Sequence, residues 1–440
     1  MHPLDLGAVA LAGAIRRRDI SSEEAVAGCL QRVAAHDPTL GAFVQVHAAA
    51  ALKVARAKDR SPSDAPFHGV PIAIKDLNFI RFRTTRFGSQ AMPAIWSPMD
   101  DVTVSRLRKA GFVLLGKTAT SELGVVPITE PAGQAPTRNP WDPERSPGGS
   151  SGGAAAAVAA ALLPVAHGSD GGGSIRIPAS FCGLVGLKAT RGTIPNHLGL
   201  RDPTLIYTCG ALARTVEDAG AMLTVQGKPV PEAKPGPLHI RVVRDVPLVT
   251  TDPDVAAALD RAVRLFTEAG HTVEETTAPA GTVDDFLPIW QQLFAQIKIM
   301  RWGRAEPVTR WLGEGGKGLD GAFVRQRQAD LTARWSPWID GCDALLTPTV
   351  SASPPRIGQY DSTDGERYFR EVALLGAWTA PFNITGHPAL SVPAGLDRLG
   401  LPMGLQLAGP MHSERTLLAL AGAIEAAMAV GSRPKVWAGA

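Results

Sequence analysis

The chain has 440 residues, and its 46 glycines and 36 prolines make up roughly a fifth of it, well above average usage. Hydrophobic residues reach 45% and charged residues only 19%, which excludes a disordered chain. The net charge of +3 is too small to indicate a nucleic-acid partner, and no apolar run is long enough to span a membrane.

The cysteines indicate the compartment and exclude one class of site. Cys29, Cys182, Cys209 and Cys342 form no CxxC pair, so no zinc or redox motif is predicted. Their spread fits reduced thiols, and the N-terminus lacks a secretory signal, so we expect a cytoplasmic protein. The histidines form no HExxH pair either. No metal or cofactor is expected, the expected partner is a small-molecule substrate, and a homodimer is left open.

The first third of the chain is predicted to pass from helices to buried strands. Residues 21–24 offer a capping box before apolar residues at helical spacing. Residues 69–74 are a short apolar run after a turn signal, which predicts a buried strand that ends at Lys75. Residues 101–118 are predicted to hold a helix followed by a strand over 112–115.

The middle of the chain alternates loops with short elements. Residues 131–153 are a long loop rich in proline and glycine, and 154–163 is a helix of strong helix formers. A short strand over 165–167 precedes a glycine loop at 168–173. The proline-rich segment 228–237 is predicted to link two halves.

The last third again alternates strands with helices, without a long internal repeat, which predicts an α/β layered fold. Its predicted helices cover 254–269 and 413–429, and its predicted strands cover 242–243, 344–346, 389–392 and 404–407.

Two glycine loops carry the serines that could do chemistry. The first, residues 146–153, contains Ser150, and the second, residues 168–176, contains Ser174 directly after three consecutive glycines. Backbone N–H groups of such a loop can point into one concavity and bind an oxyanion beside a serine nucleophile. A tight turn with an inert serine is the alternative.

Two other uses of these loops fit less well. Neither loop matches the phosphate-binding patterns GxxxxGK[ST] or GxGxxG. Residues 148–152 match the GxSxG nucleophile elbow, but residues 139–147 cannot pair as the central strand that an elbow requires. An α/β-hydrolase-like esterase is therefore the lesser alternative.

A serine nucleophile needs a base, and Lys75 is the strongest candidate. It follows an apolar run, where burial disfavours the ammonium form and lowers the pKa, so a neutral amine can accept a proton. The alternative is a snorkelling surface lysine.

Together these segments resemble the amidase signature family of serine hydrolases. Residues 69–76 resemble its lysine strand, 139–153 its first serine loop, and 168–188 its signature core, and the intervals between them agree with the family's. The resemblance implies a three-layer α/β/α sandwich with a large mixed central sheet. It also implies a single domain over 1–440, with a signature core at about 65–225 and a completing half at about 238–440.

The resemblance also implies a Ser-cisSer-Lys triad. Ser174 would be the nucleophile, Ser150 the bridging serine after a cis bond from Gly149, and Lys75 the base. The implied activity is hydrolysis of a carboxylic amide through an acyl-enzyme on Ser174.

Further residues take supporting roles by the same resemblance. The oxyanion would bind N–H groups of Gly171, Gly172, Gly173 and Ser174. Many members carry a larger residue at the position of Gly171, so we expect this glycine to open the floor of the site. The supporting residues would be Ser151, Asp170 and Arg176.

Substrate choice is less sharply indicated. We expect a free-standing enzyme for linear or aryl amides, because residues 191–196 depart from the glutaminase subunit of tRNA-dependent amidotransferases. Such a partner-dependent subunit is the alternative function.

Residues 286–338 carry five of the nine tryptophans, and Phe286, Trp290 and Leu293 recur at helical spacing. Packing on the core is the favoured interpretation. A wall over the acyl site and a membrane-surface helix are the alternatives.

Overall fold

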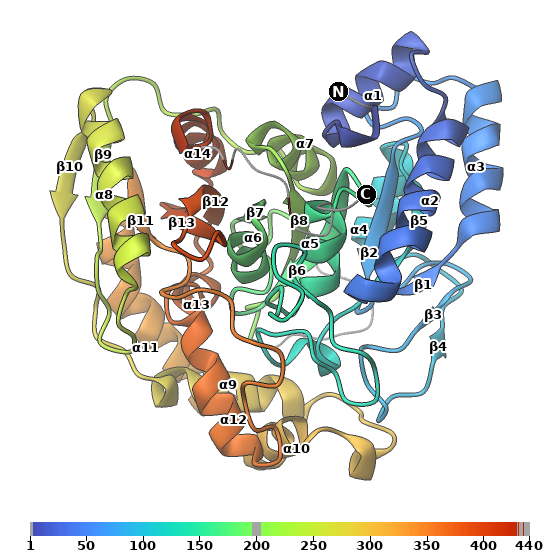
Figure 1. Ribbon diagram of the computed structural model, residues 1–440. Coiled ribbons are helices and arrows are strands. Elements are labelled where there is room, and N and C mark those ends of the chain that lie inside the picture. The colour runs from blue at the N-terminus through green and yellow to red at the C-terminus, as the bar shows by residue number, and fades with distance from the viewer. Residues whose placement is uncertain (1–2, 196–203, 429, 431–433, 435–440) are drawn as a thin grey trace.

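The computed structural model describes residues 3–195, 204–428, 430 and 434, and one mixed sheet runs through them (Figure 1). Within these residues the sheet has 11 strands, and a separate ribbon has two. The strands of the sheet are β1 (Phe43–Val46), β2 (Pro71–Lys75), β5 (Val113–Thr118), β6 (Val165–Asp170), β7 (Val185–Lys188), β8 (Thr208–Ala213), β9 (His239–Val242), β10 (Thr272–Glu275), β11 (Ala344–Pro348), β12 (Ala389–Leu396) and β13 (Pro402–Ala408), and the ribbon holds β3 (Thr84–Thr85) and β4 (Ile95–Trp96).

The strand order divides the sheet into an N-terminal and a C-terminal half. The order is β1-β5-β2-β6-β8-β7-β12-β13-β11-β9-β10, so strands from before residue 228 occupy one side and later strands the other. The antiparallel pairing of β7 with β12 joins the two sides. The proline-rich residues 228–237 lie between the halves and contain no helix or strand.

The helices vary widely in length. They are α1 (Ala8–Arg17), α2 (Ser22–Leu40), α3 (Ala48–Arg60), α4 (Val102–Lys109), α5 (Gly152–Ala159), α6 (Arg176–Cys182), α7 (Val216–Gln226), α8 (Pro253–Glu268), α9 (Val283–Ala295), α10 (Pro307–Gly315), α11 (Gly321–Asp340), α12 (Gly365–Ala373), α13 (Ala380–Thr385) and α14 (Glu414–Met428), with short 3₁₀ turns η1 (Pro3–Asp5), η2 (Glu122–Gly124), η3 (Trp302–Arg304) and η4 (Leu374–Gly376).

The helices cover both faces of the sheet, which confirms the predicted three-layer α/β/α architecture. Helices α5 and α6 pack on each other and on the central strands, whereas α7, α8 and α14 form a second connected group. Helices α9 to α12 gather beyond one end of the strands, at the bottom of Figure 1. Residues of α9 and α12 line a cavity together with Ser169 of β6, near the predicted site residues.

Several predicted elements occur with shifted bounds. The capping box at Ser21 and Glu24 is present and begins α2. Strand β6 runs on to Asp170, so residues 168–170 pair with β8 instead of opening the predicted glycine loop. Glycine suits position 168 of this central strand because there is no room for a side chain. A Cβ there would lie only 2.8 Å from Leu212 Cδ1.

Three further observations concern the C-terminal helix, the cysteines and the length of the helices. The predicted helix 413–429 corresponds to α14, and residue 429 lies outside the described residues. All four cysteines are buried free thiols. Among the helices that the structure describes, none combines the length and apolar content needed to cross a membrane. The cytoplasmic location stays a prediction.

Candidate active site

Strands β2 and β6 bring the predicted site residues to one edge of the sheet. The two strands are parallel neighbours, with Ala73 opposite Ala166. Their carboxyl ends therefore meet at the same edge, the position where ligands bind in open α/β sheets. Lys75 is the last residue of β2, and Asp170 is the last residue of β6.

Lys75 is fully buried and hydrogen-bonded to the first serine loop. Its Nζ donates to Ser150 Oγ at 2.7 Å and to Ser151 Oγ at 2.8 Å. A third, longer bond of 3.3 Å runs to the carbonyl oxygen of Ser169. Ser151 is held in turn, because its hydroxyl donates to the same Ser169 carbonyl at 3.1 Å. The peptide bond between Gly149 and Ser150 is cis.

The environment of Lys75 favours its neutral form. Burial lowers the pKa of Lys75 from its ordinary value to about 7, and the nearby Asp170 carboxylate opposes this shift only in part. At neutral pH a large fraction of the amine is therefore unprotonated. This meets the requirement for a general base, whose pKa should lie near the working pH.

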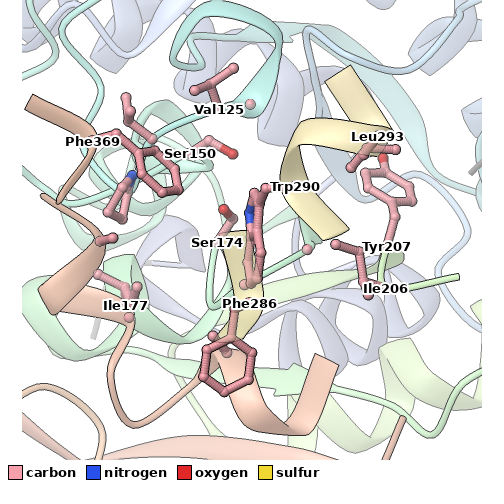
Figure 2. A pocket seen from close by; sticks show the side chains of 18 of the residues that line it. Val125, Ser150, Ser174, Ile177, Ile206, Tyr207, Phe286, Trp290, Leu293 and Phe369 are labelled. Carbon is pink, nitrogen blue, oxygen red and sulfur yellow. The ribbon is translucent and has the colours of Figure 1, made fainter. Parts of the chain in front are cut away.

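Ser174 lies on the turn between β6 and α6 and faces a cavity. Figure 2 shows the Ser150 and Ser174 side chains directed into the same cavity, which both residues line. The carbonyl oxygen of Ser174 accepts a 3.2 Å hydrogen bond from the Ser151 N–H, so the two serine loops are joined through their backbones. Among the described residues, none hydrogen-bonds the Ser174 hydroxyl.

The three glycines before Ser174 do not play equal parts. The Gly173 N–H donates to Asp170 Oδ1 at 2.7 Å, so this amide faces the carboxylate and not the cavity. Of the four predicted oxyanion donors, the N–H groups of Gly171, Gly172 and Ser174 therefore remain as candidates. Gly171 and Gly172 line the cavity, and their N–H groups have no hydrogen-bond acceptor among the described residues. A Cβ at Gly171 would meet nothing within 4 Å, so this glycine leaves the floor of the cavity open.

Gly173 requires glycine for two reasons. Its φ of +128° is in a region that L side chains rarely adopt. A Cβ at this position would also lie 2.1 Å from Thr379 Oγ1 and 2.7 Å from Ile177 Cδ1. The turn that presents Ser174 therefore depends on this residue having no side chain.

A buried ion pair fixes the turn from below. Arg176 Nη2 lies 2.9 Å from Asp170 Oδ1, and both side chains are fully buried. Burial alone would raise the pKa of Asp170, but Arg176 and Asn383 hold it well below its usual range. Arg176 also donates to Gln406 Oε1 at 2.8 Å and Asn383 Oδ1 at 2.6 Å.

Replacing Arg176 with methionine is expected to lower the free energy of unfolding by about 3–5 kcal/mol, because the buried Asp170 carboxylate loses its cation. Urea unfolding followed by circular dichroism measures this. Arg398→Met is the control, since Arg398 pairs with Asp252 and Asp254 on the exposed surface. A similar loss in both variants would contradict the role of burial.

The C-terminal half supplies residues that the sequence patterns did not single out. Asn383 Nδ2 donates to Asp170 Oδ1 at 2.9 Å and to the carbonyl oxygen of Ile206 at 3.0 Å. Thr379 Oγ1 donates to the carbonyl oxygen of Gly172 at 2.7 Å. Residues 383–389 resemble a segment of the amidase signature family only weakly, and this resemblance is the one sequence signal that includes Asn383.

The aromatic segment divides between a wall and the core. Phe286, Trp290, Leu293 and Phe294 of α9 line the cavity, which corrects the favoured interpretation that they pack only on the core. The cavity-facing side of α9 instead forms a wall of the cavity beside Ser174 (Figure 2). The tryptophans of α11 do pack in a core cluster.

The nucleophile-elbow alternative lacks its strand. Over residues 131–151 the structure has only isolated β-bridges, Asn139 with Asp142 and Arg145 with Arg356. A nucleophile elbow requires a strand that leads directly into the serine. Ser150 therefore does not sit on such an elbow.

Known proteins resemble this chain over almost its whole length. The family model described as Amidase matches residues 24–418. A putative amidase of Synechocystis sp. is 33% identical, covering 98% of this chain and 90% of the relative. The 6-aminohexanoate-cyclic-dimer hydrolase of a Pseudomonas species is 34% identical, covering 99% of this chain and 98% of the relative.

A solved structure shares the fold of this chain. The structure of 6-aminohexanoate cyclic dimer hydrolase complexed with substrate matches with a TM-score of 0.91 and 31% identity. The match covers 98% of this chain and 99% of that one.

Proposed function

This chain belongs to the amidase family, whose members hydrolyse carboxylic amides, and we propose that it does so with Ser174 as the nucleophile, Ser150 as the proton bridge and Lys75 as the base. The observation that carries the proposal is the buried 2.7 Å hydrogen bond between Lys75 Nζ and Ser150 Oγ. Ser150 and Ser174 line one cavity, and in the proposal the proton of Ser174 reaches Lys75 through Ser150.

In the first half of the reaction, neutral Lys75 takes the Ser150 hydroxyl proton as Ser150 takes the proton of Ser174. Ser174 Oγ attacks the amide carbon and forms a tetrahedral intermediate. Its oxyanion binds the N–H groups of Gly171, Gly172 and Ser174, while the Gly173 N–H stays on Asp170. Ser150 then gives a proton to the leaving nitrogen and recovers one from the Lys75 ammonium, so Lys75 is neutral again when the C–N bond breaks.

In the second half, water replaces the amine. The acyl-enzyme on Ser174 is an ester, and water attacks its carbonyl carbon while the same proton path runs again. The carboxylic acid leaves and Ser174 recovers its proton. Each group ends in its starting state, and no other reactant is needed.

The cavity lining supports linear or aryl amides as substrates. Among the described residues that line the cavity, none is charged, and most are aliphatic or aromatic. A similar curated protein is named for hydrolysis of a cyclic dimer, so cyclic amides join the candidates. Glutamine carries an ammonium and a carboxylate, for which this lining offers no ion-pair partner. This observation disfavours the amidotransferase-subunit alternative.

The proposal is tested with the purified chain alone. A panel of acyl amides and anilides is incubated with it, and released ammonia or amine is measured. We expect hydrolysis without any added protein, together with labelling of Ser174 by a fluorophosphonate probe, identified by peptide mass spectrometry. A chain that stays inactive until a partner is added, or a probe found on Ser150, would contradict it. The homodimer stays a prediction, which analytical sedimentation can check.

A further inference from the structure

Two separate apolar clusters border the catalytic cavity. One contains Val125, Ile177 and Phe369, which come from the loop after η2, from α6 and from α12. The other contains Ile206 and Phe286, which come from the segment before β8 and from α9. Members of both clusters line the same cavity as Ser174.

Trp290 lies between these clusters. Its side chain packs against both of them, as does that of Leu293 one turn further along α9. In Figure 2 the indole stands beside Ser174, with Ile177 and Phe369 on one side and Ile206 and Tyr207 on the other. Phe286 supports it with an edge-on ring contact at 6.3 Å between centroids.

The indole also reaches the floor of the cavity at the nucleophile. A Cβ at Gly172 would lie 2.9 Å from Trp290 Cζ2, so the ring rests directly against the glycine turn. Trp290 therefore extends from α9 down to the loop that presents Ser174. A substrate bound at Ser174 must pass around the ring.

We propose that Trp290 divides the catalytic cavity into two apolar lobes, and that the preferred substrates are secondary amides with one apolar group on each side of the amide bond. The inference rests on the proposed function of Ser174 and adds the substrate class. The acyl and amine substituents of an amide point away from each other, so a ring standing beside the carbonyl separates them. A primary amide has only hydrogens on its nitrogen and leaves one lobe without an apolar occupant.

The physical basis is burial on both sides of the bond. A phenyl group that enters an apolar lobe is removed from water, which stabilises the bound state and, when the lobe also fits the transition state, raises kcat/KM. A ring in each of the two lobes therefore gives a separate increase in kcat/KM. They also hold the amide carbonyl in one orientation toward Ser174, which a single apolar lobe does less well.

The test uses four amides in a two-by-two design. Acetamide, phenylacetamide, N-benzylacetamide and N-benzyl-phenylacetamide place a ring on neither side, on the acyl side, on the amine side or on both. Ammonia and benzylamine have similar basicity, so the leaving groups are comparable. For the wild-type chain we expect each ring to raise kcat/KM by about tenfold or more, nearly independently of the other.

Variants at Trp290 link these gains to the indole. Trp290→Ala should reduce the gain from both rings to about threefold or less, mainly through higher KM, because the lobes merge. Trp290→Phe keeps a flat ring, so its gains in kcat/KM from the two rings should lie between those of the wild-type chain and Trp290→Ala. Trp338→Ala is the matched control, because Trp338 is a partly buried tryptophan of α11 that packs in another cluster and does not line the cavity. It should keep both gains.

The outcomes separate this inference from the function on which it rests. If none of the four amides is hydrolysed and Ser174 is not labelled by a fluorophosphonate, both are overturned. If the amides are hydrolysed but the benzyl group on nitrogen gives no gain in the wild-type chain, only the two-lobed cavity is overturned. The same holds if Trp290→Ala keeps both gains. The wild-type comparison stands even if a variant folds poorly.

Discussion

Replacing Ser174 with alanine is expected to lower kcat/KM for amide hydrolysis by about 10⁴-fold or more, because no acyl-enzyme can form. The loss should lie in kcat, since the apolar lining that binds substrate is unchanged. Steady-state release of amine measures the effect. Fluorophosphonate labelling should disappear in the same variant.

Two further serine variants make this prediction specific. Ser150→Ala should lower kcat/KM by about 10²–10⁴-fold, the usual contribution of a positioned proton donor and acceptor. It should also slow fluorophosphonate labelling, which should still occur at Ser174. Ser180 is a buried serine of α6 that does not line the cavity, so Ser180→Ala should keep near wild-type activity. A larger loss at Ser150 than at Ser174 would reverse their assigned roles.

The activity is also expected to rise with pH through a midpoint near 7. Burial lowers the pKa of Lys75 to about 7, and only the neutral amine can accept a proton. Below the midpoint kcat/KM should fall about tenfold per pH unit, and above it kcat/KM should level off. Lys75→Met removes the base and should lower activity by about 10²–10⁴-fold while abolishing this midpoint.

A second buried lysine, Lys188, provides the control for this pH profile of kcat/KM. Burial also lowers the pKa of Lys188 to about 7, so a midpoint alone would not identify the base. Lys188 Nζ donates to the carbonyl oxygen of Ala189 at 3.0 Å and contacts neither Ser150 nor Ser174. Lys188→Met should therefore keep the midpoint. Its loss in Lys188→Met, with an unchanged profile in Lys75→Met, would remove Lys75 as the base.

The residues that sequence reasoning assigned to the triad lie in short local patterns. Lys75 ends an apolar run, and Ser150 and Ser174 lie in glycine loops whose spacing resembles a known family. These patterns can be recognised in one sequence because each loop's backbone path depends on glycines close to its serine. The alternation of strands and helices likewise indicated the layered fold, though not the strand order.

The remaining features depend on contacts between distant segments. Arg176 meets Asn383 and Gln406 only through the packing of α6 against the C-terminal strands and α13. The role of Trp290 depends on which face of α9 turns toward the glycine loop, and helical spacing alone does not identify that face. The donation of the Gly173 N–H to Asp170 is a further detail that no residue pattern encodes.

The contacts of Arg176 have a consequence for how the enzyme is made. During synthesis Lys75, Ser150 and Ser174 leave the ribosome first, and Asn383 and Gln406 follow more than 200 residues later. Until then the guanidinium and the carboxylate beneath the nucleophile lack these partners, and strand β7 has no neighbour in β12. A nascent chain therefore carries Lys75, Ser150 and Ser174 before Arg176 has all its partners, so we expect no hydrolysis until Asn383 and Gln406 have been made.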